Sequence, residues 1–176
     1  TMGCDIHLRL ERKAKGQSKW QECHIFGYDR CWGNRIYGMF AALADVRNYN
    51  NIEYLPPRGI PKDATRSTLL AYGYAVVMDA EKRFDFQCGR SQAKDWVESG
   101  YSEYLESDGV KYVSDPDWHT PSWCTTAEME DCINRIFRNE DGELFGGYSE
   151  WLALLGAMKG YEADGGECRA VFWFDN

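Results

Sequence analysis

Asp5 and His7, near the start of the chain, carry the first side chains that could do chemistry. They lie two positions apart in the alternating run 3–8, which predicts a strand with both on one face and the apolar residues on the other. With His119 they form a ligand set known from iron and zinc centres, and His24 could substitute for one of the three. One hypothesis is therefore a metal-dependent phosphoester hydrolase using Asp5, His7 and His119 with zinc, iron or manganese. Hydrogen bonds to nearby loops are the simpler interpretation of the same pair.

A second hypothesis is a binding site for a nucleotide-like, phosphorylated molecule. Such a site needs a cation for phosphate, an aromatic ring for stacking, and amides or carboxylates for the base and ribose. The residues that supply these groups on predicted loops, beside the strand pair, are Asp5, His7, Arg47, Asn48, Arg58, His119, Ser122 and Trp123. Two other interpretations stay open: the arginines pair with some of the 28 acidic residues, and the tryptophans belong to the core.

A complete catalytic signature is missing. Ser122 has no GxSxG around it, Cys4 belongs to the apolar strand face, and the helical HExxH pattern is absent. Neither a P-loop nor a Rossmann glycine pattern occurs, so ATP- or NAD-driven chemistry has no support. Catalytic residues are therefore unassigned, no cofactor is expected on the binding hypothesis, and a non-enzymatic binder is slightly favoured.

Composition restricts the class of partner. The chain has 176 residues with a net charge of −8, and no basic run, which disfavours binding to duplex nucleic acid. No apolar run reaches the roughly 20 residues that cross a bilayer. The seven cysteines are odd in number and without a CxxC pair, and no signal peptide is evident, so we expect reduced thiols in the cytoplasm. Thr1 ahead of Met2 resembles an expression scar. The sequence leaves open whether the protein forms a homo-oligomer.

Turn residues and periodicity predict the elements. We expect a hairpin of strands 4–11 and 18–26, with Leu8 opposite Cys23 and Arg9 opposite Glu22. The remaining expectations are a helix 34–47 capped by Asn34, irregular 48–66, an ambiguous apolar 67–80, a helix 92–105 capped by Ser91, a strand 110–114, a loop 115–123, a helix begun by the capping box of Thr125 and Glu128, a helix 149–159, and a buried strand 168–174.

This order predicts an α+β fold. A small, mainly antiparallel sheet, made of the N-terminal hairpin and the C-terminal strand, is covered by helices in a single domain, 1–176. The last strand is placed beside the first, which brings Asp5 and His7 near Asp175 and Asn176 or to opposite ends of the sheet. We expect the polar side chains of Asp5, His7, Arg58 and His119 to meet around one cavity.

Several blocks in order resemble one protein family. These are 2–7 (MGCDIH), 43–48 (LADVRN), 57–61 (PRGIP), 119–123 (HTPSW) and 171–176 (VFWFDN). The set is similar to the uncharacterised "MGCDIH" proteins of bacteriophages and bacteria, along the whole chain except 63–112. The resemblance implies a phage origin and candidate positions, without a reaction.

With that origin, the leading hypothesis is a phage protein that sequesters a nucleotide-like host signal and so acts in anti-defence. A protein-interaction module that blocks a host protein is a further alternative.

Overall fold

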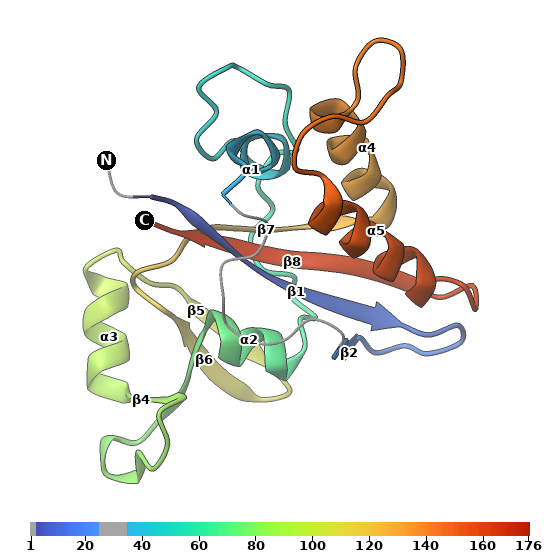
Figure 1. The fold of residues 1–176 in the computed structure, drawn as a ribbon. Helices are drawn as coiled ribbons and strands as arrows, with labels where there is room; N and C mark the ends of the chain where they lie inside the picture. The colour runs from blue at the N-terminus through green and yellow to red at the C-terminus, as the bar shows by residue number, and fades with distance from the viewer. Residues whose placement is uncertain (1–2, 25–34) are drawn as a thin grey trace.

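The computed structural model describes residues 3–24 and 35–176, and within them the chain forms two four-stranded sheets and five α-helices (Figure 1). The first sheet has the order β2-β1-β8-β7, with all neighbours antiparallel. Its strands are β1 (Asp5–Lys13), β2 (Gln21–Glu22), β7 (His119–Thr125) and β8 (Glu167–Asp175). The α+β class and the pairing of the first and last strands are confirmed.

A second sheet, of which the sequence predicted the strand 110–114 but not its partners, has the order β4-β3-β6-β5. Its strands are β3 (Gly73–Val77), β4 (Gln87–Gly89), β5 (Tyr104–Ser107) and β6 (Val110–Ser114). β3 follows directly from α2 (Arg66–Tyr72), which explains why 67–80 was ambiguous: it holds half a helix and half a strand. The 3-10 helix Asp79–Glu81 and α3 (Arg90–Glu98) lie in the segments that connect the strands of this sheet.

The remaining helices cover the apolar face of the first sheet (Figure 1). They are α1 (Tyr37–Ala44), α4 (Thr126–Phe137) and α5 (Ser149–Tyr161). Phe172 and Phe174 of β8 are fully buried against them, as the apolar run in the sequence predicted. The opposite face of the same strand carries Val171 and Trp173, which pack against Tyr72 of α2. β8 is therefore covered on both faces.

Two helix starts differ from prediction in their caps. The predicted cap Asn34 lies outside the described residues, and α1 begins after Ile36 without a side-chain cap. α3 begins after Gly89, because Ser91 instead bonds to Asp79. The capping box that opens α4 is confirmed: Thr125 Oγ1 accepts from the Glu128 N–H, and Glu128 accepts from the Thr125 N–H.

The hairpin forms with a register two residues away from the predicted one. Glu22 pairs with Glu11 rather than Arg9, and the Cys23 N–H donates to Leu10 O. An even shift keeps every side chain on its predicted face, so the polar face of β1 is unchanged. Among the described residues, no helix is both long and apolar enough to cross a membrane.

β7 replaces most of the predicted loop 115–123, and it contains a β-bulge. His119 pairs with Phe174 and Ser122 with Phe172, so three steps along β7 match two along β8. Thr120, inside the bulge, has a φ of 48°. In a regular register, with each of the three steps back from Ser122 matched by one step along β8, His119 would lie opposite Asp175, on the face that carries His7. The bulge therefore moves His119 to the helix-covered face, where its ring stacks on Phe174.

Candidate functional site

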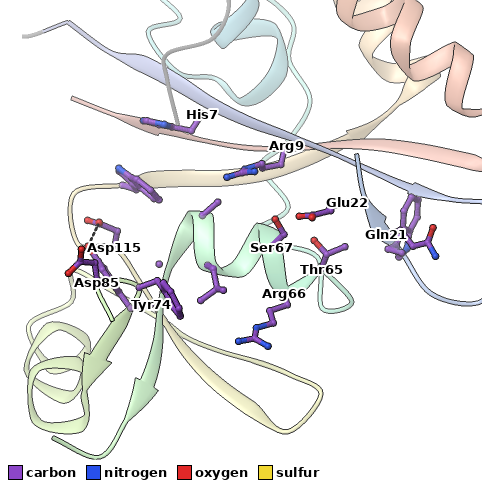
Figure 2. A pocket seen from close by; sticks show the side chains of 16 residues that line it. His7, Arg9, Gln21, Glu22, Thr65, Arg66, Ser67, Tyr74, Asp85 and Asp115 are labelled. Atoms are coloured by element: carbon purple, nitrogen blue, oxygen red, sulfur yellow. Dashed lines mark hydrogen bonds between the residues drawn. The ribbon is translucent and has the colours of Figure 1, made fainter. Parts of the chain in front are cut away.

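A groove of about 910 Å³ lies between the polar face of the first sheet and the part of the fold that contains α2 and the second sheet (Figure 2). Strands β1 and β2 line one side, and α2 with the start of β3 lines the other. The polar side chains that Figure 2 labels in it are His7, Arg9, Gln21, Glu22, Thr65, Arg66, Ser67, Tyr74, Asp85 and Asp115. Trp20, Phe86 and Trp118 add aromatic rings.

His7 is held in a fixed orientation at one end of the groove. Its Nε2 lies 2.8 Å from Asp175 Oδ2, the pair made possible by the antiparallel register of β1 and β8. The imidazole also stacks on Trp118, with 5.0 Å between ring centroids, and lies beside Trp173. Only 16% of the His7 side chain is exposed. A carboxylate and two indoles thus limit the ring to one orientation.

Tyr74 and Asp115 form a second polar pair in the groove. The Tyr74 hydroxyl donates to Asp115 Oδ2 at 2.9 Å, the bond drawn in Figure 2. Burial, and then this bond to a carboxylate, raises the pKa of Tyr74 to about 12. Tyr74 is therefore a neutral hydrogen-bonding group at neutral pH and contributes an aromatic face to the groove.

Two arginines reach the groove from different elements. Arg9 follows His7 by two positions on β1, so it extends from the same strand face, whereas Arg66 is the first residue of α2 (Figure 2). Glu22 and Asp85 lie at separate places along the lining. The groove thus combines cations, carboxylates and aromatic rings, the three kinds of group that a nucleotide-like ligand requires.

A buried ion cluster fixes α2 against β1. Arg169 donates to Glu11 Oε2 at 2.7 Å, and Glu11 Oε1 accepts from the Thr65 N–H at 2.6 Å and from Thr68 Oγ1 at 2.8 Å. Arg169 also donates to Asp63 Oδ1 at 2.8 Å. Burial acts against the Asp63 carboxylate, but the Arg169 bond and charge outweigh it and lower the pKa of Asp63. Every buried charge here has partners, which is the condition for a stable buried ion pair.

Beside this cluster, cations and indoles alternate in a row that runs Arg58, Trp123, Arg169, Trp20, Lys13. The cation-to-centroid distances along it are 4.7, 5.9, 3.9 and 4.9 Å. The row lines a separate cleft of about 610 Å³. The row joins the hairpin, the proline-rich loop 56–61 and strands β7 and β8. Each contact between a cation and an indole stabilises the fold by about 0.5–1 kcal/mol where it is exposed and by more where it is buried.

The predicted site residues lie in five separate places, and His7 is the one that lines the groove. Asp5 forms a two-bond ion pair with Arg35 and lines another hollow with Asp117 and Asn176. Asn48 supports its own loop, bonding to Asp45 and to both backbone groups of Ile52.

Arg47 and His119 lie near each other around Asn176. Arg47 donates to Asn176 Oδ1 at 3.3 Å, and His119 Nδ1 lies 2.9 Å from Thr120 Oγ1, whereas its buried Nε2 has no hydrogen-bond partner among the described residues. Burial lowers the pKa of His119, and the nearby side chains of Asn176 and Asp175 oppose this shift. These two residues lie at the edge of the helix-covered face, away from the groove.

Arg58, Ser122 and Trp123 form the last of these groups. Ser122 Oγ accepts from the Arg58 N–H at 3.1 Å, which fixes the proline-rich loop on β7, and the Arg58 side chain stacks on Trp123. Its guanidinium pairs with both oxygens of Glu128, and this bond lowers the pKa of that carboxyl. The loop thus holds Arg58 in a defined place, at the cleft rather than at the groove.

The expectation that Asp5, His7, Arg58 and His119 share one cavity is therefore wrong. His7 and His119 lie on opposite faces of the sheet because of the bulge in β7. His24 is exposed and pairs with Glu22. Within the described ranges no group of three or more His, Cys, Asp or Glu side chains could hold a metal ion, so the predicted ligand set does not assemble.

Sequence reasoning did not assign Arg9, Arg66, Tyr74 and Trp118 to the site. For Arg9 a signal was present, since it continues the alternation of Asp5 and His7 on the polar strand face. The others depend on the packing of the second sheet against the first, for which the sequence has no local signal.

No family model, no curated protein and no solved structure matches the chain.

Proposed function

We propose that the chain is a binding protein for a small, nucleotide-like phosphorylated molecule, with the groove as its site. In line with the family resemblance, we propose that it acts as a phage protein in the cytoplasm of the infected bacterial cell and sequesters a host signalling molecule in anti-defence. The observation that carries the proposal is the groove itself, where Arg9 and Arg66 lie among aromatic rings and carboxylates.

The dimensions of the groove fit this class of ligand. Small-molecule sites usually measure about 300–1,000 Å³, and the groove measures about 910 Å³. Arginines bind phosphate oxygens in pairs of hydrogen bonds, and the Trp118 and Phe86 rings offer stacking surfaces for a base. Glu22, Asp85 and Asp115 then face the amino groups or the ribose hydroxyls.

Charge favours a small ligand over a polymer. The net charge of −8 repels a long polyanion, while two arginines in a groove are enough for a single phosphate group. No nucleic-acid partner is proposed for this reason.

Isothermal titration calorimetry with cyclic and linear nucleotides tests the proposal. We expect binding of a nucleotide and much weaker binding of the matching nucleoside, since the phosphate meets arginine. Arg66→Met removes one charged contact, about 1.5–3 kcal/mol, and should weaken binding by roughly 10- to 100-fold. Arg90→Met is the matched control, because Arg90 is likewise exposed and is the first residue of its helix, α3, away from the groove. Absence of heat and of thermal shift with every nucleotide at millimolar concentration would refute the proposal.

A protein-interaction module is the second candidate, supported by exposed aromatic side chains next to the groove. Phe84 and Phe86 are 55% and 43% exposed and stack on each other at 5.2 Å. If this pair contacts a host protein, Phe84→Ser should abolish capture of that protein and leave nucleotide titrations unchanged, since Phe84 is outside the groove lining.

A further inference from the structure

The groove runs along β1 and has an indole at each end. At one end Trp118 stacks on His7, with 5.0 Å between the ring centroids. At the other end lies Trp20, and Lys13 Nζ is 4.9 Å from the centroid of its ring. Six strand residues separate His7 from Lys13 on β1, so at about 3.3 Å per residue the two indoles stand up to about 20 Å apart.

Helix α2 forms the opposite wall and covers the stretch of β1 between these ends. The N–H of its N-cap, Thr65, donates to Glu11 Oε1 at 2.6 Å. Its last residue, Tyr72, packs on Trp173 at 5.2 Å between ring centroids, and Trp173 is the β8 partner of His7. The helix therefore extends from the position of Glu11 to that of His7.

Both arginines of the groove lie in the middle of this length. Arg9 is two positions after His7 on the polar face of β1, whereas Arg66 is the first residue of α2 and lies near Glu11 (Figure 2). Arg9 is partly exposed and Arg66 is exposed. Because the two guanidinium groups come from opposite walls, each can bind one of two adjacent phosphates through a pair of hydrogen bonds.

Each end of the groove also carries hydrogen-bonding groups beside its indole. Near Trp118 these are the Tyr74 hydroxyl and the Asp115 carboxylate, which are 2.9 Å apart. Near Trp20 it is the carboxylate of Glu22, from the neighbouring strand β2. Such groups recognise the edge of a base whose face stacks on the adjacent ring. The order along the groove is therefore aromatic ring, cations, aromatic ring.

From this order we infer that the ligand is a dinucleotide in which two nucleosides are joined 5′ to 5′ through a central pyrophosphate. The inference rests on the proposed function and names the ligand class for the same groove. The pyrophosphate lies between Arg9 and Arg66, and one base stacks at each of the two indoles. A single nucleotide has only one base, so it occupies one end and leaves the other indole without a partner. The groove volume of about 910 Å³ is near the upper limit of small-molecule sites, about 1,000 Å³, in keeping with the larger ligand.

Isothermal titration calorimetry of the intact wild-type protein compares diadenosine diphosphate with ADP, which keeps the pyrophosphate but lacks the second nucleoside. We expect one molecule of diadenosine diphosphate per chain, bound about 5- to 150-fold more tightly than ADP, the effect of one more base stacked on an aromatic ring. Equal dissociation constants would overturn the inference and leave the proposed function standing, because ADP is itself a nucleotide. Absence of binding by either compound would refute both.

Replacement of Trp20 tests the far end of the groove. Trp20→Leu should weaken the binding of diadenosine diphosphate by the same factor and leave that of ADP almost unchanged, because ADP still binds at the Trp118 end. Trp123→Leu is the matched control: this indole also contacts Arg169 and is partly buried, but it lines the cleft rather than the groove. An unchanged affinity for diadenosine diphosphate in Trp20→Leu, or an equal loss in Trp123→Leu, would overturn the inference.

Discussion

Replacement of Arg169 by methionine tests whether the buried ion cluster holds α2 on the first sheet. Glu11 has no exposed surface and Arg169 only 4%, so Arg169→Met leaves a carboxylate buried without its cation. Removal of one partner from a buried pair typically costs 3–5 kcal/mol. The lost contact with Trp20, at 3.9 Å, adds about 1 kcal/mol. We expect a loss of about 4 kcal/mol in the free energy of unfolding and, for a chain of this size, a fall in Tm of roughly 8–16 °C.

A double variant separates the free-energy cost of a buried, unpaired carboxylate from the cost of the packing that is lost with the Arg169 side chain. Glu11→Gln keeps an oxygen that accepts from Thr65 and Thr68 but carries no charge, so the unfavourable burial of a carboxylate disappears. In the Arg169→Met background it should therefore restore about 2 kcal/mol. Alone, Glu11→Gln should cost about 1.5–3 kcal/mol, because Arg169 keeps its bond to Asp63.

Urea denaturation followed by tryptophan fluorescence gives all four free energies, and the cycle gives the coupling between the two positions. Arg90→Met, an exposed cation, should change stability by less than about 0.5 kcal/mol and serves as the control. The reasoning fails if Arg169→Met costs less than about 1 kcal/mol, or if the double variant is no more stable than Arg169→Met.

Two further predictions concern the pH dependence of an ion pair and the space around glycines. Arg58 lowers the pKa of Glu128, so the stabilisation from this pair is present above the ordinary glutamate pKa and is lost as pH falls through the lowered one. Glu128→Gln, which keeps the helix cap, should therefore cost about 1 kcal/mol at pH 7 and almost nothing at pH 2.5 in urea titrations; an equal cost at both values would contradict the pairing. A Cβ at Gly73 would lie 2.0 Å from Val113 O, whereas at Gly156 nothing lies within 4 Å. Thermal unfolding should show Gly73→Ala destabilised by about 3 kcal/mol or more and Gly156→Ala stabilised by about 0.5–1 kcal/mol, and equal effects would count against the close approach of β3 to β6 at Gly73.

Local signals in the sequence predicted the elements that depend on nearby residues. The capping box of Thr125 and Glu128 predicted the start of α4, and the apolar run of β8 predicted a central strand with both faces covered. The polar face of β1 followed from alternation alone, even though the hairpin register was two residues off.

The rest depends on contacts between distant segments. In the second sheet, the sequence predicted the strand 110–114 but not the short strands β3, β4 and β5 that complete it. β7 carries a proline and a bulge that are typical of a loop. Without that bulge the alternation rule would have placed His119 on the face of His7. The position of α2 beside the groove, in turn, depends on the buried Glu11, which accepts from Thr65 and Thr68 and pairs with Arg169 from the other end of the chain.

The bulge in β7 decides which face of the sheet His119 occupies. If β7 paired with β8 residue for residue back from Ser122, without a bulge, His119 would lie opposite Asp175 and its imidazole would be on the side of His7. Two imidazoles and a carboxylate would then share one surface, the starting composition for an engineered transition-metal centre. The register of one short segment of β7 thus separates a surface suited to recognition from one suited to coordination chemistry.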